Sequence, residues 1–299
     1  MGGDAILTQS LTKDYGGGKG LFDLTLSVHD GEVFGYLGPN GAGKTTTIRL
    51  LMSLIRPTRG AATVFGLDTV SRSVDVKRVV GYLPGELAQF GGLRGDEIVG
   101  SFAALRPDVD RAFVGQLSER LDLDLGRRYR EYSRGNKQKL GIVLAFMHRP
   151  RLLILDEPTG GLDPLNQQTF YALVRETRER GATVFLSSHV LSEVEAVCDR
   201  VGIIREGKLV KVADLDELNE LHQRRIEVQF AGEPPLAALR AIRNVDQLVA
   251  NGSLVRCVIR GDAGAFVRAL GVAHVVALTS EEPSLEESFL AYYRSDAPV

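Results

Sequence analysis

The chain has 299 residues, of which 44% are hydrophobic and 25% charged, and its formal net charge at pH 7 is -2. These proportions are those of folded globular proteins, so they exclude a largely disordered or fibrous chain, and the length suffices for two domains. Basic and acidic residues nearly balance, at 36 and 38, so the composition lacks the cationic excess typical of nucleic-acid-binding proteins, and we expect no nucleic-acid partner.

No segment of the sequence has the features of a membrane span or of a secretory signal. The longest run of apolar residues and glycine, Gly141 to Met147, is far shorter than the roughly 20 residues that a spanning helix needs. Met1 to Asp4 lack the basic and apolar regions of a signal peptide, so we expect a cytoplasmic protein. Cys198 and Cys257 have no metal-ligand spacing and are expected to be ordinary buried thiols.

The first strong pattern in chain order is a strand, a glycine-rich loop and a helix. Glu32 to Leu37 predict a buried strand, and Thr47 to Met52 are compatible with a helix. The intervening loop fits G-x-x-x-x-G-K-T, whose backbone N–H groups bind phosphate at a helix N-terminus. Lys44 is expected to reach the β- and γ-phosphates of a nucleotide, and Thr45 to offer its hydroxyl to Mg²⁺. The candidate nucleotide-binding residues of this loop are Gly38, Pro39, Asn40, Gly41, Ala42, Gly43, Lys44, Thr45 and Thr46.

Further short apolar runs predict more strands, at Val79 to Leu83, Leu152 to Leu155, Thr183 to Ser187 and Val201 to Ile204. Several of them are apolar throughout, as strands covered on both faces would be. Gly85 to Pro150 lack a strand pattern and contain amphipathic stretches, so this segment is predicted to be a mainly helical insertion.

Two adjacent carboxylates end the strand at Leu152 to Leu155. Asp156 is placed to meet the Mg²⁺ side of a nucleotide. Glu157 is turned differently by the alternation of side chains, and it can act on the attacking water as a general base or as an orienting group. A phosphate-binding loop by itself would also fit a GTPase or a small-molecule kinase, but Asn136 to Lys139 lack the Asp expected for guanine recognition.

The order and spacing of these motifs resemble the ATP-binding cassette of ABC transporters, over about Ala5 to Asn219. Tyr15 stands where that family places an aromatic side chain that stacks on adenine. Tyr132 to Gln138 are similar to the family signature LSGGQ, with Ser133 and Gly135 matching. The resemblance implies that this segment closes over the γ-phosphate held by another subunit.

Three more positions take their expected roles from the same resemblance. Gly160 to Asp163 resemble the D-loop that passes between subunits, with Asp163 as a nucleotide-site residue, and His189 resembles the switch histidine that contacts the γ-phosphate. Where the family usually has Gln, after Pro84, this chain has Gly85-Glu86. Glu86 is the candidate substitute as a metal-side or water-side oxygen, and Gln89 is the alternative.

The C-terminal part predicts a compact β-α-β-β-α-β series, which matches a ferredoxin-like arrangement. The predicted elements are strand Arg225 to Phe230, helix Leu236 to Arg243, strand Asp246 to Ala250, strand Ser253 to Arg260, helix Gly264 to Leu270 and strand His274 to Thr279. Asn251-Gly252 forms the hairpin turn between the two central strands. A last helix is predicted to begin at Ser284, with Glu287 completing a capping box.

The predicted fold class is therefore α/β: a P-loop NTPase domain of the ABC ATPase type over residues 1–218, with a helical subdomain at about 85–150, followed by a small α+β ferredoxin-like domain over 219–299. The second domain is expected to be accessory or regulatory.

The resemblance implies an ATPase that binds ATP and Mg²⁺. It is expected to dimerise with itself or with a second ATP-binding subunit, and to power a separate integral membrane permease from the cytoplasmic face of the membrane. Glu282 to Leu290 resemble the tail of ATP-binding subunits of ABC-2 exporters, which implies export of drugs, antibiotics or related hydrophobic compounds. The alternative is a soluble ABC-type ATPase that acts on DNA or ribosomes. The cargo itself stays open, because its contacts belong to the permease.

Overall fold

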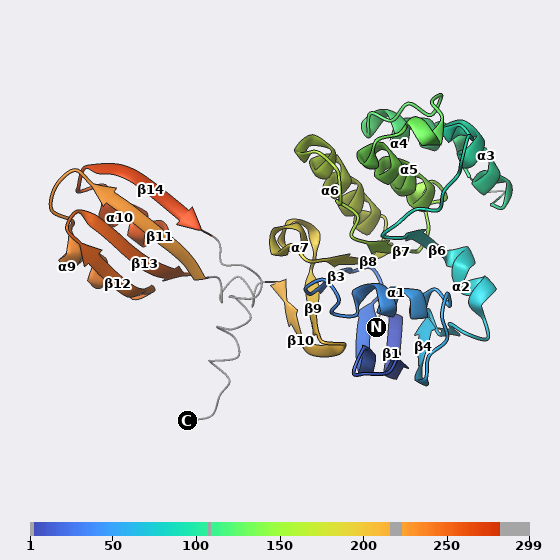
Figure 1. The fold of residues 1–299 in the computed structure, drawn as a ribbon, viewed down its shortest axis with the longest axis horizontal. Coiled ribbons are helices and arrows are strands. Elements are labelled where there is room, and N and C mark those ends of the chain that lie inside the picture. Colours follow the sequence, from blue (N-terminus) through green and yellow to red (C-terminus); the bar gives the residue numbers. More distant parts are fainter. Residues whose placement is uncertain (1–2, 107–108, 216–222, 282–299) are drawn as a thin grey trace. The chain divides into compact units, whose positions relative to one another are not determined.

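The computed structural model describes residues 3–106, 109–215 and 223–281 (Figure 1). The chain divides into two compact units, Met1–Ala213 and Asp214–Val299, each with its own hydrophobic core. This division falls shortly before the domain boundary predicted after residue 218.

The first unit is built on a six-stranded sheet with the order β10-β9-β3-β8-β7-β6. Its strands are β3 (Val33–Leu37), β6 (Val80–Leu83), β7 (Leu152–Asp156), β8 (Thr183–Ser188), β9 (Arg200–Arg205) and β10 (Lys208–Asp214). From β9 to β6 all neighbours are parallel. Every residue of β3, β7 and β8 is buried, which explains why these strands read as continuous apolar runs. The strands predicted at these places are confirmed, and their carboxyl ends meet at one edge.

A second, antiparallel sheet in this unit was not predicted. It has the order β2-β1-β4-β5 and consists of β1 (Asp4–Asp14), β2 (Gly20–His29), β4 (Arg59–Val64) and β5 (Leu67–Asp68). The pairing of β1 with β2 shifts register at three places along the strands. Such irregularities break the two-residue alternation of buried and exposed side chains, so β1 and β2 lack the pattern by which a strand is recognised in sequence.

Four of the helices pack directly against these two sheets. They are α1 (Lys44–Leu51), α2 (Ser73–Val79), α6 (Pro164–Glu179) and α7 (Leu191–Val197). One core cluster contains Ile6 of β1, Ile48 of α1 and Phe185 of β8. Helix α1 therefore packs between the two sheets, and its N-terminus lies at the edge where the parallel strands end.

The predicted helical insertion is confirmed in the described part of residues 85–150. It contains α3 (Gly95–Ala104), α4 (Arg111–Arg120), the short 3₁₀ helix η1 (Tyr129–Glu131) and α5 (Arg134–Phe146), and Figure 1 shows α3, α4 and α5 gathered together beyond β6. A side chain at Gly141 would come within 2.5 Å of Leu83. Glycine at this position lets α5 lie directly against β6.

The second unit follows the predicted order of elements. It comprises β11 (Gln223–Phe230), α9 (Leu236–Arg240), β12 (Val245–Asn251), β13 (Leu254–Arg260), α10 (Gly264–Leu270) and β14 (Val275–Glu281), with the antiparallel sheet order β12-β13-β11-β14. The first helix ends at Arg240, before the predicted Arg243. The helix predicted from Ser284 lies outside the described residues. Within the described parts of the chain, none of the helices has the length and apolarity to cross a membrane.

Candidate functional site

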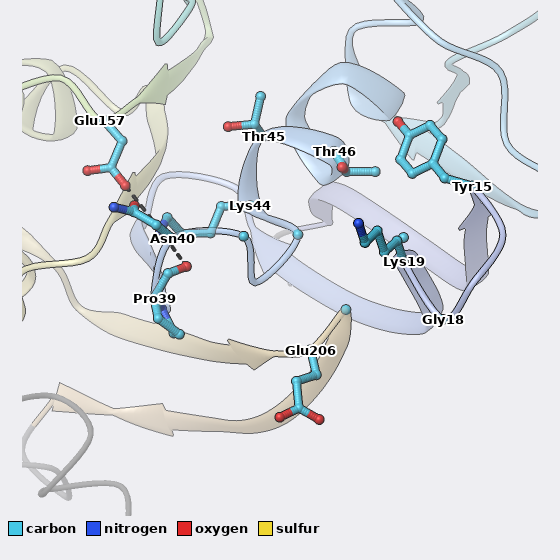
Figure 2. Close-up of a pocket in the computed structure, with 14 residues that line it drawn as sticks. Tyr15, Gly18, Lys19, Pro39, Asn40, Lys44, Thr45, Thr46, Glu157 and Glu206 are labelled. Atoms are coloured by element: carbon cyan, nitrogen blue, oxygen red, sulfur yellow. Dashed lines mark hydrogen bonds and ion pairs between the residues drawn. The ribbon is translucent and has the colours of Figure 1, made fainter.

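A pocket of about 580 Å³ opens at the edge where the parallel strands end. Its lining combines the loop between β3 and α1, the loop between β1 and β2, the residue after β7 and the turn between β9 and β10 (Figure 2). It is lined by Tyr15, Gly18, Lys19, Gly20, Pro39, Asn40, Gly41, Gly43, Lys44, Thr45, Thr46, Glu157, Glu206 and Gly207. Most of the predicted nucleotide-binding residues thus surround one cavity.

The glycine-rich loop has a backbone conformation that is unfavourable for residues with a side chain. Gly41 and Gly43 have φ values of +82° and +111°, in the region that favours glycine. A Cβ at Gly38 would collide with the carbonyl oxygen of Ile204. Helix α1 begins at Lys44, so the loop leads directly into a helix N-terminus, where backbone N–H groups attract an anion.

Lys44 has its ammonium group inside this loop. Its Nζ donates to the carbonyl oxygens of Gly38 at 2.5 Å and Pro39 at 3.2 Å, and it lies 3.1 Å from Oε1 of Glu157. Only 5% of the lysine side chain is exposed. A buried cation needs such partners, and here they hold the ammonium at the phosphate-binding loop.

Asp156 is held by hydroxyl groups from two other elements. Oγ1 of Thr45 donates to Oδ2 at 2.8 Å, and Oγ of Ser187 donates to Oδ1 at 2.7 Å. Asp156 and Ser187 are partners in the parallel register of β7 and β8, and Asp156 is 1% exposed. The carboxylate and the Thr45 hydroxyl therefore lie side by side. This is the arrangement expected of two oxygen ligands for a cation such as Mg²⁺.

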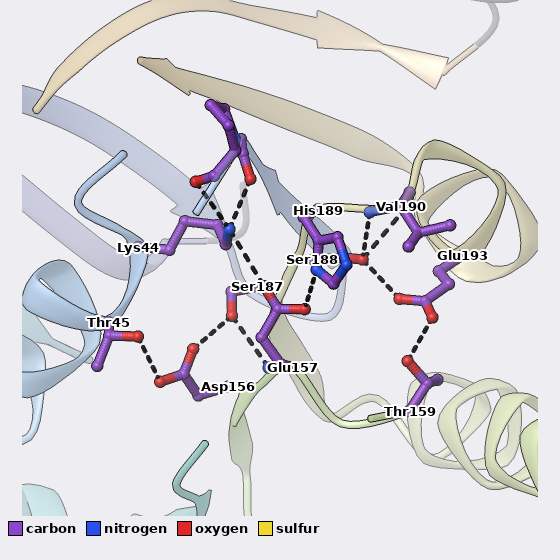
Figure 3. Close-up of polar contacts among 12 residues, drawn as sticks. Lys44, Thr45, Asp156, Glu157, Thr159, Ser187, Ser188, His189, Val190 and Glu193 are labelled. Carbon is purple, nitrogen blue, oxygen red and sulfur yellow. Dashed lines mark hydrogen bonds and ion pairs between the residues drawn. The ribbon is translucent and has the colours of Figure 1, made fainter. Parts of the chain in front are cut away.

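Glu157 directly follows β7 and has an unusual backbone conformation. Its φ of 50° lies in the left-handed region, which costs a non-glycine residue about 1–3 kcal/mol and is found preferentially at functional sites. Its N–H donates to Oγ of Ser187 at 3.1 Å. Its other carboxylate oxygen, Oε2, lies 2.7 Å from Nδ1 of His189 (Figure 3). One carboxylate thus joins the buried lysine to the histidine.

The loop after β6 lies beside Asp156. A Cβ at Gly85 would sit 3.2 Å from Oδ2 of Asp156. Burial, together with the negative charge of Asp156, raises the pKa of Tyr82 to about 12. Glu86 and Gln89 are both exposed, so either remains a candidate for the role that the family usually gives to glutamine.

Tyr15 lies at the far end of the pocket from Glu157 (Figure 2). The residue is 54% exposed, and Nζ of Lys13 lies 5.6 Å from the centroid of its ring. An exposed aromatic face at the mouth of a cavity is free to stack on a flat base.

Five lining residues were missed in the sequence: Gly18, Lys19, Gly20, Glu206 and Gly207. Lys19 could have been noticed from its place in the glycine-rich stretch that follows Tyr15. The turn that carries Gly207 could not, because only the tertiary structure brings it to the loop, where its N–H donates to the carbonyl oxygen of Ala42 at 2.9 Å.

The predicted residues of the signature and D-loop segments, Ser133, Gly135 and Asp163, are absent from the described lining of this pocket. Gly38, Ala42, Glu86, Asp156 and His189 are not part of that lining either. Ser133 caps α5, its Oγ accepting from the N–H of Asn136 at 3.2 Å. Asp163 caps α6 in the same way, and its hydrogen bonds from Asn166 lower the pKa of its carboxyl group. A Cβ at Gly135 would lie 2.7 Å from the carbonyl oxygen of Gly161, so the two segments are in close contact with each other.

Comparison with known proteins gives consistent matches. The family model described as ABC transporter matches residues 21–160. The bacitracin transport ATP-binding protein BcrA of Bacillus licheniformis is 39% identical over 236 residues, which cover 76% of each chain. The probable multidrug ABC transporter ATP-binding protein YbhF of Escherichia coli is 34% identical over 73% of this chain and 38% of its own.

Solved structures match as well. An ATP-binding subunit of an ABC transporter superposes with a TM-score of 0.66 at 30% identity, covering 72% of this chain and 92% of its own. A dimeric ATP-binding cassette bound to ADP and Pi shares the fold, with a TM-score of 0.61 at 19% identity over 70% of this chain and 98% of its own.

Proposed function

Because this chain belongs to the ATP-binding proteins of the ABC transporter family, we propose that it hydrolyses ATP to power a separate integral membrane permease, at the cytoplasmic face of the membrane. The cargo we assign to that permease is a drug, an antibiotic or a related hydrophobic compound. This assignment is supported by the names of two similar proteins, which state bacitracin transport and multidrug transport.

The observation that carries this proposal is the convergence of a phosphate-binding loop with two carboxylates and a histidine. Lys44 contacts Glu157, and Glu157 contacts His189. A γ-phosphate bound at the loop would draw the Lys44 ammonium toward its own oxygens. The Glu157 carboxylate would then be available to orient the attacking water or to accept its proton, with His189 next to it.

Mg²⁺ fits the oxygen ligands that Thr45 and Asp156 offer at 2.8 Å from each other. Magnesium is commonly held by one or two protein oxygens together with substrate phosphates. When bound, it would neutralise charge on the phosphate oxygens. Ser187 keeps the Asp156 carboxylate in place from the other side.

The other predicted residues are proposed to act across a dimer, with a second copy or with another ATP-binding subunit. Ser133 is exposed at the N-terminus of α5, and neither it nor Gly135 or Asp163 belongs to the described lining of the pocket around Lys44. A helix N-terminus attracts phosphate, so in a dimer these residues would complete the site of the partner. ATP would favour the closed dimer, and loss of the γ-phosphate contacts would release it.

We assign these activities to an ATP-binding domain over residues 1–218. The β-α-β-β-α-β unit within 219–299 is proposed to be an accessory or regulatory domain.

Two measurements test this function. The first is phosphate release by the purified protein with ATP or GTP, with Mg²⁺ or with a chelator, and we expect turnover of ATP that requires Mg²⁺. The second is purification of the tagged protein from detergent-solubilised membranes, followed by mass spectrometry, and we expect a polytopic membrane protein at stoichiometric yield. Recovery with ribosomes or DNA instead would overturn the transporter assignment.

A further inference from the structure

Glu193 links two segments near the site by hydrogen bonds, and the function proposed above gives this residue no role. It lies in the first turn of α7, and its carboxylate accepts hydrogen bonds from the end of β8 and from the loop after β7 (Figure 3). Oγ of Ser188 donates to Oε2 at 2.5 Å, and Oγ1 of Thr159 donates to Oε1. Thr159 is 4% exposed and Ser188 is 0% exposed, so both hydroxyl groups are sheltered from water, where hydrogen bonds to a carboxylate are strong.

Each of these hydroxyl groups lies next to a site residue in the chain: Ser188 ends β8, and Thr159 lies in the loop after β7. Ser188 directly precedes His189, and its carbonyl oxygen accepts from the N–H of Gly38 at 3.2 Å. Thr159 follows Glu157 closely in the loop after β7. The Glu193 carboxylate therefore links the segment that carries His189 to the loop that carries Glu157. The segment that carries His189 also contacts the phosphate-binding loop.

Tyr171 of α6 experiences the charge of the same carboxylate. Tyr171 is 7% exposed, and burial together with the negative charge of Glu193 raises the pKa of its hydroxyl group. The N–H of Val190 donates to Oγ of Ser188 at 2.9 Å, which fixes the orientation of that hydroxyl. Glu193 is thus embedded in a set of ordered contacts.

We propose that Glu193 is a positioning residue for ATP hydrolysis: by bridging Ser188 and Thr159, it holds His189 and Glu157 at the distance they need to act together. This inference rests on the proposed function. Glu193 is not among the residues that line the described pocket, so its effect falls on the rate of the chemical step and not on nucleotide binding. A displacement of about 1 Å in such a pair can cost about 100-fold in rate.

The test compares kcat with nucleotide affinity. We expect Glu193→Ala to lower kcat by about 10- to 100-fold, with the Kd for a non-hydrolysable ATP analogue unchanged within about twofold. Glu193→Gln keeps one acceptor and gains a donor, and hydroxyl groups can accept as well as donate. We therefore expect Glu193→Gln to restore most of the kcat that alanine loses.

Removing the two hydroxyl groups that donate to Glu193 provides a second test of the proposal. Thr159→Val and Ser188→Ala each delete one hydroxyl, and together they are expected to reproduce the loss of kcat in Glu193→Ala. Adding Ser188→Ala to Glu193→Ala is expected to lower kcat no further, because the pair acts as a unit. Thr169→Val is the matched control, since its hydroxyl only donates to the carbonyl oxygen of Leu165 within α6.

The outcomes separate this inference from the function on which it rests. A wild-type protein without Mg²⁺-dependent ATP turnover overturns the proposed function. Wild-type turnover with an unchanged kcat in Glu193→Ala and in the Thr159→Val, Ser188→Ala double variant overturns only the role of Glu193. A loss of nucleotide affinity equal to the loss of kcat, or no rescue by glutamine, also overturns it, because the effect would then be a general disturbance of the fold.

Discussion

Nδ1 of His189 lies 2.7 Å from Oε2 of Glu157, and the other oxygen of the same carboxylate lies 3.1 Å from Nζ of Lys44. The histidine side chain is 51% exposed and the glutamate 27%, whereas the lysine is 5% exposed. The carboxylate therefore stands between a buried cation and an accessible ring, at the mouth of the phosphate-binding loop. This arrangement makes Glu157 the first residue to test.

Glu157→Gln is expected to reduce ATP turnover by about 100-fold or more, because an amide cannot accept the proton of the attacking water. ATP binding should persist, since the loop and Lys44 are unchanged. Light scattering at saturating ATP and Mg²⁺ should then show an accumulated dimer. Glu119→Gln, on an exposed part of α4, is the control and should turn over like the wild type. A monomer of Glu157→Gln under these conditions would contradict the proposed dimer.

Gly135→Ala is expected to disturb the contact between the start of α5 and the loop before α6. The new methyl group would lie 2.7 Å from the carbonyl oxygen of Gly161, so one of the two backbones must move. Forcing an extra carbon into a packed contact typically costs about 1–3 kcal/mol. We expect a lower melting temperature and lower ATP turnover. Gly115→Ala, where a Cβ would meet nothing within 4 Å, should have neither effect.

Tyr15→Ala is expected to weaken ATP binding, whereas Tyr15→Phe should retain it. Stacking of a base on an aromatic ring is worth about 1–3 kcal/mol when measured by alanine substitution, so the Kd should rise at least about fivefold. Fluorescence titration with a labelled nucleotide measures this directly. Equal affinities of the alanine variant and the wild type would remove Tyr15 from the nucleotide site.

The variants Glu86→Ala and Gln89→Ala test which side chain of the loop after β6 takes the role that the family usually gives to glutamine. That loop starts beside Asp156, at Gly85, so a missing oxygen ligand there should raise the Mg²⁺ concentration that gives half-maximal turnover. We expect this rise in Glu86→Ala and wild-type behaviour in Gln89→Ala. An unchanged Mg²⁺ dependence in both would mean that neither side chain replaces the glutamine of the family.

Stability is expected to depend on pH through His148. Burial, with a smaller contribution from the nearby Arg106 guanidinium, lowers the pKa of its ring to about 4. The unfolded chain therefore binds the proton first, and stability falls as the pH drops from about 6.5 towards 4, by at most about 1.4 kcal/mol per pH unit.

Melting temperatures measured across this pH range check that expectation. His148→Gln should flatten the dependence. His274→Gln, at an exposed position, should leave it unchanged. An identical slope in His148→Gln and the wild type would assign the acid sensitivity to other groups.

Much of the site was predictable because its chemistry is local in sequence. The loop from Gly38 to Thr45 carries its own phosphate-binding geometry in its glycines and in the helix start that follows. Asp156 and Glu157 could be assigned to the same site because the carboxyl ends of parallel strands meet at one edge of a sheet. The elements of the second unit were predictable for a similar reason, since short alternating runs flank an Asn-Gly turn at Asn251.

What the sequence by itself determined, then, is which residue types are present and which strand end or helix start each occupies. Only the tertiary structure decided their pairings: Lys44 with Glu157, Glu157 with His189, and Glu193 with both Thr159 and Ser188. Each of these contacts joins loops whose distance is set by the packing of the strands behind them. No local pattern encodes that packing, because a hydrogen bond between distant segments depends on the register of the whole sheet.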